Sequence, residues 1–231
     1  MDLANKVVVI TGANGGLGNS VTNAFLEAGA RVFGVSLAIA ASDFPNPRFS
    51  AITAKLSSAA DAQALIDSVV KQAGRIDGLV HLVGGFAGGQ SVAETDDATF
   101  DRMFDMNLRS AFHLFRAVVP RMRSQGSGRI VAIGSKAAVE PAPMAGAYAA
   151  SKAALVSLVR TVAREESAHG ITANVVLPGT MDTPANRVAM PGADPSKWVQ
   201  PAQVASLLVH LVSDSASQIN GAVIPIYGAE A

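Results

Sequence analysis

The chain has 231 residues, 49% of them hydrophobic, and its 18 Lys and Arg residues balance its 18 Asp and Glu residues. A chain of this length and composition can bury a sizeable core as one domain. The balanced charge provides neither a basic surface for nucleic acid nor a polybasic patch for a membrane. The absence of Cys excludes a disulfide scaffold, a thiolate nucleophile and cysteine-ligated metals. No stretch of about twenty apolar residues occurs, and the run from Val7 to Ile10 is too short for a signal peptide, so we expect a soluble, cytoplasmic protein.

Seven short apolar segments are predicted to form buried strands. The first, from Lys6 to Thr11, is continuous and β-branched, as expected of a strand covered on both faces of a parallel sheet. The others run from Arg31 to Val35, Phe49 to Ala54, Gly78 to Val83, Arg129 to Ile133, Thr172 to Leu177 and Ala222 to Ile226. Helical patterns lie between most of them. The sequence therefore predicts an α/β fold, a single domain over residues 1–231 with a Rossmann-type doubly wound parallel sheet of about seven strands flanked by helices.

A glycine-rich loop follows the first predicted strand and precedes a helix expected from near Leu17 to Gly29. It reads Thr11-Gly12-Ala13-Asn14-Gly15-Gly16-Leu17-Gly18. Glycines permit a tight turn and a close backbone approach to a pyrophosphate, whose charge is met by N–H groups at the helix N-terminus. The spacing differs from the usual Gly-x-Gly-x-x-Gly and lacks the Gly-Lys-Ser/Thr of a P-loop. We therefore expect a dinucleotide site rather than an NTPase.

Tyr148 and Lys152 are one helical turn apart, so their side chains share a face of the predicted helix. A nearby cation favours the phenolate and lowers the pKa of a Tyr. Ser135 lies thirteen residues before Tyr148, at the end of a predicted strand. Taken alone, the pair is also compatible with a half-buried Tyr packed on a Lys stem, and Ser135 with a turn or cap residue.

Together these motifs resemble the short-chain dehydrogenase/reductase family in order and spacing, over nearly the whole chain. The motifs are Thr11-Gly12-x-x-x-Gly16-x-Gly18, Asn107, Ser135, Tyr148-x-x-x-Lys152 and Pro178-Gly179-x-x-x-Thr183. The resemblance implies a catalytic set of Asn107, Ser135, Tyr148 and Lys152. Tyr148 would be the proton donor or base, and Ser135 would polarise the substrate oxygen. Lys152 would lower the pKa of Tyr148 and bind the nicotinamide ribose, and Asn107 would anchor a water that relays protons to Lys152.

The resemblance also implies a set of cofactor contacts and an assembly. The cofactor residues would be Gly12, Asn14, Gly16, Leu17, Gly18, Ser36, Leu56, Gly84, Tyr148, Lys152 and Thr183, the last contacting the nicotinamide carboxamide. The family commonly packs the helices that carry Asn107 and Tyr148 against symmetry mates, so a homotetramer or homodimer is expected. No metal is expected, because His81, His113, His169 and His210 show no ligand spacing.

The end of the second predicted strand bears on the choice of cofactor. An acid there usually accepts the ribose 2′-OH of NAD, and a nearby Arg meets the 2′-phosphate of NADP. This chain has Ser36 followed by Leu37, with neither. Since no carboxylate repels a phosphate, and Lys55 adds positive charge nearby, we expect NADP(H) slightly before NAD(H).

Three functions stay open from the sequence. Ser135 favours reduction of a ketone or aldehyde, or oxidation of the corresponding alcohol. The segments from His81 to Gly89, from Lys136 to Ala138 and from Met181 to Trp198 resemble the dihydropteridine reductase branch, which would act on a quinonoid pterin. That branch carries a small apolar residue in place of Ser135 and an acid in place of Ser36. A cofactor-bound regulator is the third, although a binder has no need of a proton donor.

The substrate pocket is only outlined by the sequence. Its apolar candidates are Phe86, Met144, Met181, Met190 and Trp198, which fit a bulky, partly aromatic or aliphatic substrate, although each also fits ordinary packing. The segment of residues 180–200 has the length and the Pro and Gly content of a substrate lid. The expected partner is a small carbonyl or alcohol compound, with no nucleic acid and no membrane.

Overall fold

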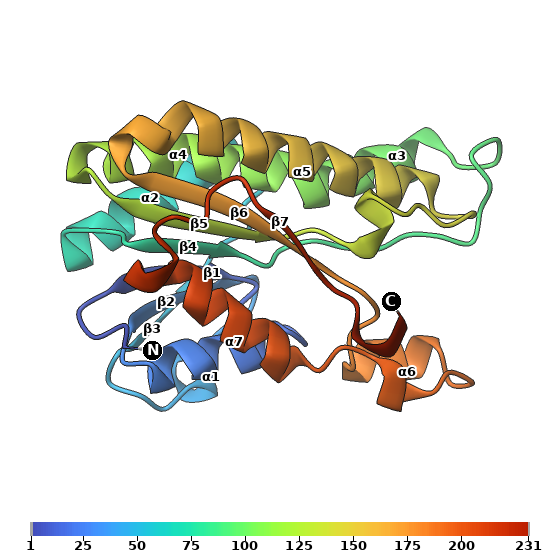
Figure 1. Cartoon of the computed structure of the whole chain (residues 1–231), viewed down its shortest axis with the longest axis horizontal. Helices are drawn as coiled ribbons and strands as arrows, with labels where there is room; N and C mark the ends of the chain where they lie inside the picture. Colours follow the sequence, from blue (N-terminus) through green and yellow to red (C-terminus); the bar gives the residue numbers. More distant parts are fainter. Residues whose placement is uncertain (1, 231) are drawn as a thin grey trace.

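The computed structural model describes residues 2–230 and shows one seven-stranded parallel sheet between two layers of helices (Figure 1). The strands run in the order β3-β2-β1-β4-β5-β6-β7. They are β1 (Val7–Thr11), β2 (Arg31–Ser36), β3 (Phe49–Thr53), β4 (Gly78–His81), β5 (Gly128–Ile133), β6 (Ile171–Pro178) and β7 (Val223–Ile226). The predicted Rossmann-type fold and its seven strands are confirmed, with strand ends that differ from expectation by one or two residues.

Helices cover both faces of the sheet. One face carries α1 (Gly18–Glu27) and α7 (Pro201–Val212), and the other carries α2 (Ala59–Ala73), α4 (Ser110–Gln125) and α5 (Gly146–Glu166) (Figure 1). Two shorter helices, α3 (Asp97–Phe104) and α6 (Pro184–Ala189), lie at the end of the molecule where the strands finish. No helix within residues 2–230 combines the length and apolarity needed to cross a membrane.

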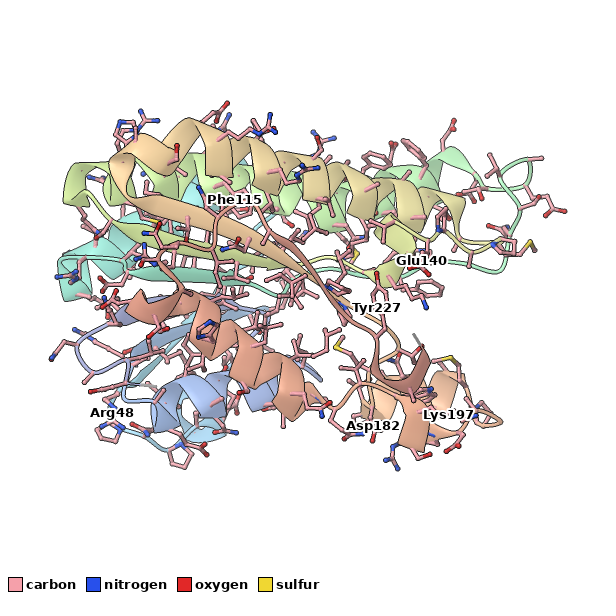
Figure 2. All side chains as sticks on the ribbon, in the orientation of Figure 1. Arg48, Phe115, Glu140, Asp182, Lys197 and Tyr227 are labelled. Atoms are coloured by element: carbon pink, nitrogen blue, oxygen red, sulfur yellow. The ribbon has the colours of Figure 1, made fainter. Side chains whose placement is uncertain are left out.

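The position of β1 between two layers of helices explains why its sequence is continuously apolar. Val7 and Val9 belong to the core under α2, α4 and α5, where Phe115 also lies (Figure 2), whereas Val8 and Ile10 belong to the core under α1 and α7. Successive side chains of a strand point to opposite faces, so a strand with helices on both sides has no polar face.

The helix boundaries follow local capping chemistry. Ser58 begins α2 by accepting a hydrogen bond from Asp61 N, while the Asp61 carboxylate accepts one from Ser58 N. Gly74, with φ of 76°, ends the same helix in the left-handed conformation. By contrast, α1 begins at Gly18 without any side-chain cap and without an acidic residue in its first turn. Its N-terminus is therefore available to an anion.

The strand order reverses between β1 and β4. From β1 the chain moves outward through β2 and β3, then returns to place β4 on the other side of β1. Thr11 and His81, the last residues of β1 and β4, are partners in the ladder. A crevice opens beyond the carboxyl ends of two such strands, and the glycine loop begins immediately after Thr11.

The helix that carries Asn107 is not regular, contrary to our expectation of an ordinary helical position. Between α3 and α4 lies η2 (Asp105–Arg109), a single π-helical turn in which Ser110 N donates to Asp105 O, five residues back. Such turns insert one extra residue and occur often at functional sites. Asn107 lies at the centre of this turn and is fully buried.

Candidate active site

A cleft of about 640 Å³ opens at the carboxyl ends of β1, β2 and β4. Eight of the predicted cofactor residues line it: Gly12, Asn14, Gly16, Leu17, Gly18, Ser36, Leu56 and Gly84. The other three, Tyr148, Lys152 and Thr183, do not line this cleft, although Lys152 lies close to Gly84 and Thr183 lies close to Gly16. The structure therefore gathers the glycine loop, the end of β2 and the residues after β3 and β4 around one cavity.

The glycine loop fits a pyrophosphate. A Cβ on Gly18 would lie 2.0 Å from Gly12 O, so only glycine allows the loop to close so tightly. A Cβ on Gly16 would lie 3.2 Å from the Thr183 side chain, which brings the cofactor loop against the base of the predicted lid. Within residues 2–230, no acceptor pairs with the N–H groups of Gly16 and Leu17. These donors, at the start of α1, suit the phosphates of a dinucleotide.

Asn14 has a structural task in addition to lining the cleft. Its Nδ2 donates to Ala38 O at 2.7 Å and to Asp43 Oδ2 at 3.0 Å. The amide therefore ties the glycine loop to the segment after β2, where the ribose of an adenosine would lie. Asn14 would shape this part of the cleft through its position, because its amide hydrogens are already engaged.

Tyr148, half-buried near the start of α5, faces Ser135 just after β5. Burial raises the pKa of Tyr148, and the hydrogen bond with the Ser135 side chain opposes this by lowering it. Ser135 Oγ also accepts a hydrogen bond from Ala137 N at 3.2 Å, which fixes its rotamer. The Phe86 ring meets the Tyr148 ring edge-on at 5.0 Å between centroids. The structure thus brings together the predicted proton donor and the predicted oxygen-binding hydroxyl.

Lys152 lies one turn further along α5 and is only 5% exposed. Its ammonium donates to Ile133 O at 2.9 Å, and burial lowers its pKa to about 8. Burial of the phenol raises the pKa of Tyr148 in this structure, and a lowering of that pKa by Lys152 stays a prediction. A Cβ on Gly84 would lie 3.0 Å from Lys152 Nζ and 2.8 Å from Asn107 Oδ1, so glycine is required there.

Asn107 connects three separate segments. Its Oδ1 accepts from Gly85 N at 2.8 Å, and its Nδ2 donates to Gly85 O at 3.0 Å and to Ser151 Oγ at 3.0 Å. Ser151 Oγ in turn donates to Tyr148 O at 2.7 Å. The amide therefore fixes the loop after β4 to α5, next to the Lys152 ammonium.

The base of the predicted lid is held by regular hydrogen bonds. Val199 N donates to Thr180 O at 2.8 Å and Asp182 N donates to Val199 O at 2.9 Å. Arg187 makes a bidentate ion pair with Asp182, whose pKa it lowers. Asp182 and Lys197 lie at the same end of the molecule as Tyr227 (Figure 2). The segment of residues 180–200 is thus anchored at its base, with α6 largely exposed between the anchors.

The apolar pocket candidates divide into two groups. Phe86, Met144 and Met190 are 69%, 46% and 38% exposed, so they offer apolar surface to a ligand. Trp198 is only 5% exposed, and Met181 packs against the core under α1 and α7. For these two residues, ordinary packing is the interpretation that the structure supports.

Sequence reasoning missed the helical side of the cleft. Asp105, Met106, Arg109 and Ser110 line it from η2 and the start of α4, and Arg109 pairs with Asp105 at 2.5 Å. The i, i+4 spacing of Asp105 and Arg109 was visible, but it is typical of any solvated helix face. Ser151 was missed because a Ser inside a helix gives no sequence signal of its own.

Lys136, the residue after Ser135, lies over the Tyr227 ring at 4.7 Å and pairs with Glu140 at 3.5 Å. Glu140 and Tyr227 lie close together in Figure 2, toward the end of the molecule where the strands finish. Lys136 therefore links the segment after β5 to the end of β7. Its side chain is positioned by this contact and by the Glu140 carboxylate.

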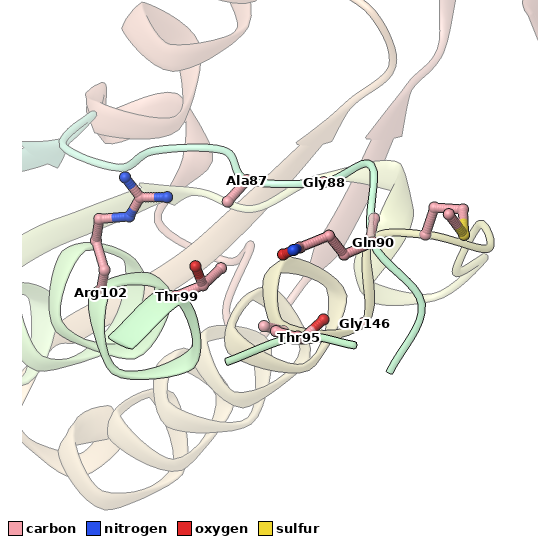
Figure 3. Close-up of a pocket in the computed structure, with 10 residues that line it drawn as sticks. Ala87, Gly88, Gln90, Thr95, Thr99, Arg102 and Gly146 are labelled. Atoms are coloured by element: carbon pink, nitrogen blue, oxygen red, sulfur yellow. The ribbon is translucent and has the colours of Figure 1, made fainter. Parts of the chain in front are cut away.

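A second pocket of about 90 Å³ lies between α3, the segment after β4 and the start of α5 (Figure 3). Gln90 approaches it from the segment after β4, and Thr99 and Arg102 from α3. Met144, one of the apolar pocket candidates, lines it, but none of the predicted catalytic or cofactor residues does, and it is much smaller than the main cleft. The predicted cofactor contacts therefore belong to the main cleft.

Among residues 2–230, no group of three or more His, Asp or Glu side chains gathers where a metal ion could bind. His81, the last residue of β4, is buried, whereas His169 pairs with Glu166 at 3.3 Å on the surface. The reacting groups that the structure brings together are hydroxyls, an amide and an ammonium. Such a set handles protons and suits an organic redox cofactor rather than a metal.

Comparison with known proteins agrees with this arrangement. The family model described as short chain dehydrogenase matches residues 6–193, so the chain belongs to the short-chain dehydrogenase/reductase family. The short chain dehydrogenase adrF of Penicillium rubens is 32% identical over 249 residues, covering 97% of this chain and 96% of that protein. Asnovolin H dehydrogenase nvfC of Aspergillus novofumigatus is 32% identical over 247 residues with the same coverage.

Solved structures show the same likeness. The crystal structure of gox2181 superposes with a TM-score of 0.92 at 30% identity, covering 99% of this chain and 96% of that one. Levodione reductase superposes with a TM-score of 0.90 at 27% identity, covering 98% and 97%. The named relatives are dehydrogenases and reductases, which supports an oxidoreductase.

Proposed function

We propose that this protein is an NAD(P)(H)-dependent oxidoreductase that transfers hydride between a nicotinamide and a carbonyl or alcohol carbon. The observation that carries the proposal is the hydrogen bond between Tyr148 and Ser135, with buried Lys152 and Asn107 behind it and the glycine-loop cleft alongside. A binding module has no need for such an arrangement of proton-handling groups. The proposed reaction acts on a CH–OH group or on the corresponding C=O group.

Each residue has a role in this chemistry. A bound nicotinamide would supply or accept the hydride. Ser135 would hold the substrate oxygen and stabilise the negative charge that develops on it. Tyr148 would donate its phenolic proton to that oxygen during reduction and take the proton back during oxidation. Lys152 would favour the phenolate by its charge and contact the nicotinamide ribose, and Asn107 would hold a water that passes protons to Lys152.

The substrate screen is the direct test. Disappearance or formation of the reduced nicotinamide is followed with NADPH and with NADH, across ketones, aldehydes, their alcohols and a quinonoid dihydropteridine. We expect turnover of carbonyl or alcohol compounds, abolished in Tyr148→Phe. Unchanged turnover in Tyr148→Phe would contradict the mechanism. Cofactor binding without turnover of any compound would favour the cofactor-bound regulator.

The second candidate is reduction of a quinonoid pterin, favoured by the loop sequences that resemble dihydropteridine reductases. Ser135 distinguishes the two, because polarising a carbonyl uses its hydroxyl whereas reduction of the pterin can proceed with Tyr148 and Lys152 alone. Activity only on the quinonoid pterin, retained in Ser135→Ala, would favour this second function.

We expect NADP(H) to be preferred slightly. Ser36 and Lys55 both line the cleft, and a hydroxyl beside a cation accepts a 2′-phosphate more readily than a carboxylate would. Ser36→Asp should therefore shift the ratio of kcat/KM values toward NADH by about tenfold, equivalent to about 1.4 kcal/mol. Ser36→Thr, which keeps the hydroxyl, is the matched control. A wild-type enzyme that prefers NADH would contradict this assignment.

The exposed apolar side chains support a bulky apolar substrate. Phe86 packs on Tyr148 and is still 69% exposed, so it can contact a substrate held at the phenol. The residue 180–200 segment would close over the substrate and cofactor. Limited proteolysis tests this closure, and we expect protection within residues 184–197 when the dinucleotide is added. Cleavage that is unchanged by cofactor would argue against a lid.

We also propose a homotetramer or homodimer formed through the helices that carry Asn107 and Tyr148. Phe100 on α3 and Phe112 on α4, on either side of the turn that carries Asn107, are each 45% exposed, which supports an apolar contact surface there. Light scattering after gel filtration measures the mass, and Phe112→Glu should reduce it. A monomeric wild-type protein would contradict the proposal.

The cytoplasmic location expected from the sequence stays a prediction.

A further inference from the structure

His81 is 1% exposed, and both of its ring nitrogens have partners. Its Nδ1 lies 2.9 Å from Oγ1 of Thr11 on β1, and its Nε2 lies 3.4 Å from Oγ of Ser110 on α4. Because Thr11 and His81 are partners in the parallel ladder, the first contact follows from the sheet register. The second contact crosses from the sheet to the helix. The imidazole therefore joins β1 to α4 through its two ring nitrogens.

The hydrogen bonds assign one tautomer to His81. Ser110 Oγ donates its only hydrogen to Met106 O at 2.7 Å, so it accepts a hydrogen bond from the His81 Nε2–H. Nδ1 is then the acceptor for the Thr11 hydroxyl. Burial first, and then the charge of Lys152, lower the pKa of His81 to about 3. The imidazole is therefore neutral at physiological pH, as this arrangement requires.

The chain of hydrogen bonds ends in the π-helical turn η2. Met106 belongs to this turn, and Ser110 N closes it on Asp105 O. Ser110 Oγ holds the neighbouring carbonyl of Met106, so His81 reaches the turn through a single hydroxyl. The next residue is Asn107, whose Oδ1 and the Lys152 Nζ both lie against Gly84. A shift of the turn would therefore move the Asn107 amide relative to the Lys152 ammonium.

We propose that His81 is a positioning residue: it ties β1 and β4 to the π-helical turn through Ser110 and so holds Asn107 in place beside Lys152. The proposal rests on the function proposed above, in which Asn107 and Lys152 act in proton transfer. His81 itself does not line the main cleft. Its effect on the reaction is therefore exerted through the turn.

Two conservative variants remove the two hydrogen bonds of the His81 ring one at a time. The amide of Asn can occupy the place of Nδ1, so His81→Asn keeps the Thr11 contact and loses the Ser110 contact. The longer Gln places its amide near Nε2, so His81→Gln keeps the Ser110 contact and loses the Thr11 contact. His210→Asn and His210→Gln on α7 are the matched controls. Because an Asn or Gln can satisfy buried partners, both variants are expected to fold.

Hydrogen exchange followed by mass spectrometry measures how readily the backbone of the π-helical turn opens, independently of enzyme activity. We expect faster exchange in peptides that span residues 103–112 for His81→Asn than for His81→Gln and the wild type. Equal exchange in all three proteins would overturn the proposal. Faster exchange in His81→Gln than in His81→Asn would also overturn it, because the sheet contact would then matter more than the contact with the turn. If His81→Asn does not fold, Ser110→Ala removes the same link and is expected to give the same exchange pattern.

Steady-state kinetics, on a substrate whose turnover requires the Tyr148 hydroxyl, then tests the consequence for the reaction. We expect kcat of His81→Asn to fall about tenfold, with KM for the dinucleotide changed less than twofold and the pH profile of kcat displaced. For His81→Gln, we expect kcat within about threefold of the wild type. Equal losses in both variants, or none in His81→Asn, would contradict the positioning role. Turnover that does not depend on Tyr148 would instead contradict the proposed function, leaving the exchange result to decide the role of His81.

Discussion

Two regions of the site differ in how their side chains are held. The polar floor, formed by Thr11, His81, Asn107, Ser110, Ser151 and Lys152, is no more than 5% exposed at any residue. The apolar rim, formed by Phe86, Met144, Val188 and Met190, is between 38% and 82% exposed. Each floor residue has hydrogen-bond partners within the chain, whereas the rim leaves large apolar surfaces open. We infer that the floor sets the chemistry and that the rim selects the substrate.

The effect of a substitution on the reaction should therefore differ between the floor and the rim. A buried polar group that loses its partner carries the full penalty of desolvation, so substitutions in the floor disturb geometry and charge together. An exposed apolar side chain loses only contact area with a ligand. Changes in the floor should therefore act on kcat, and changes in the rim on KM. The predictions below test this division, beginning with the largest expected effect.

Among substitutions in the floor, Lys152→Met should cause the largest loss of kcat. We expect kcat to fall by about 10³-fold, because the substitution removes the cation that favours the phenolate and contacts the cofactor ribose. The melting temperature should not fall with it, since burial already disfavours the charged ammonium, as its lowered pKa indicates. Lys71→Met on the exposed side of α2 is the control. A variant with near wild-type kcat would remove Lys152 from the mechanism.

Ser135→Ala should lower kcat for a carbonyl substrate by about 10²-fold, the usual effect of removing one donor to a developing oxyanion. The substitution also removes the hydrogen bond that lowers the pKa of Tyr148. The reaction in the direction of alcohol oxidation should therefore need a higher pH, since Tyr148 must lose its proton to act as a base. Rates measured from neutral to alkaline pH in both directions test this. An unchanged pH profile would show that Ser135 does not control Tyr148.

Phe86→Ala tests the role of the apolar rim in substrate binding. We expect KM for an apolar substrate to rise about tenfold, equivalent to about 1.4 kcal/mol of lost contact, with kcat nearly unchanged. Val92→Ala, at a residue that is 80% exposed, is the matched control and should change neither parameter. A large loss of kcat with constant KM would place Phe86 with the floor, as a support for Tyr148.

His81→Gln has the smallest expected effect on turnover, and its main consequence is for stability in acid. The folded-state pKa of His81 is about 3, below its ordinary value of 6.5, so between these values the unfolded chain binds the extra proton. The free energy of unfolding should therefore fall as the pH falls through this window, by up to about 1.4 kcal/mol per pH unit from this group. Denaturant titrations of wild type and His81→Gln between pH 4 and 7 should show a shallower slope for the variant. Equal slopes would mean that folding does not lower the pKa of His81.

The sequence predicted the sheet because burial on two faces leaves a local pattern. Val7, Val8, Val9 and Ile10 are consecutive and apolar for that reason, and the glycine loop follows directly. The four catalytic candidates were also predictable, since each lies within a motif of fixed spacing. Their roles stay predictions, but the structure brings their side chains together.

Other features depend on contacts between distant segments. No residue from Phe104 to Ser110 marks the π-helical turn, and the partners of its Asn107 amide, Gly85 and Ser151, are far away in the sequence. The burial that raises the pKa of Tyr148 had no signal in the sequence, because it depends on the packed fold in which the Phe86 ring meets the phenol. Trp198 was expected in the pocket, but it packs into the protein at the base of the predicted lid.

The division between floor and rim is tested most directly at Tyr148, whose backbone oxygen accepts a hydrogen bond from Ser151 of the floor. The measurement is the rate of hydride transfer in a single turnover at saturating substrate. The rate is compared in the wild type, Tyr148→Phe and Phe86→Ala, two variants that alter the two rings in edge-on contact. We predict a fall of about 10³-fold for Tyr148→Phe and a rate within about threefold of the wild type for Phe86→Ala. The account would be contradicted if Tyr148→Phe retained the wild-type rate, or if Phe86→Ala lost as much rate as Tyr148→Phe.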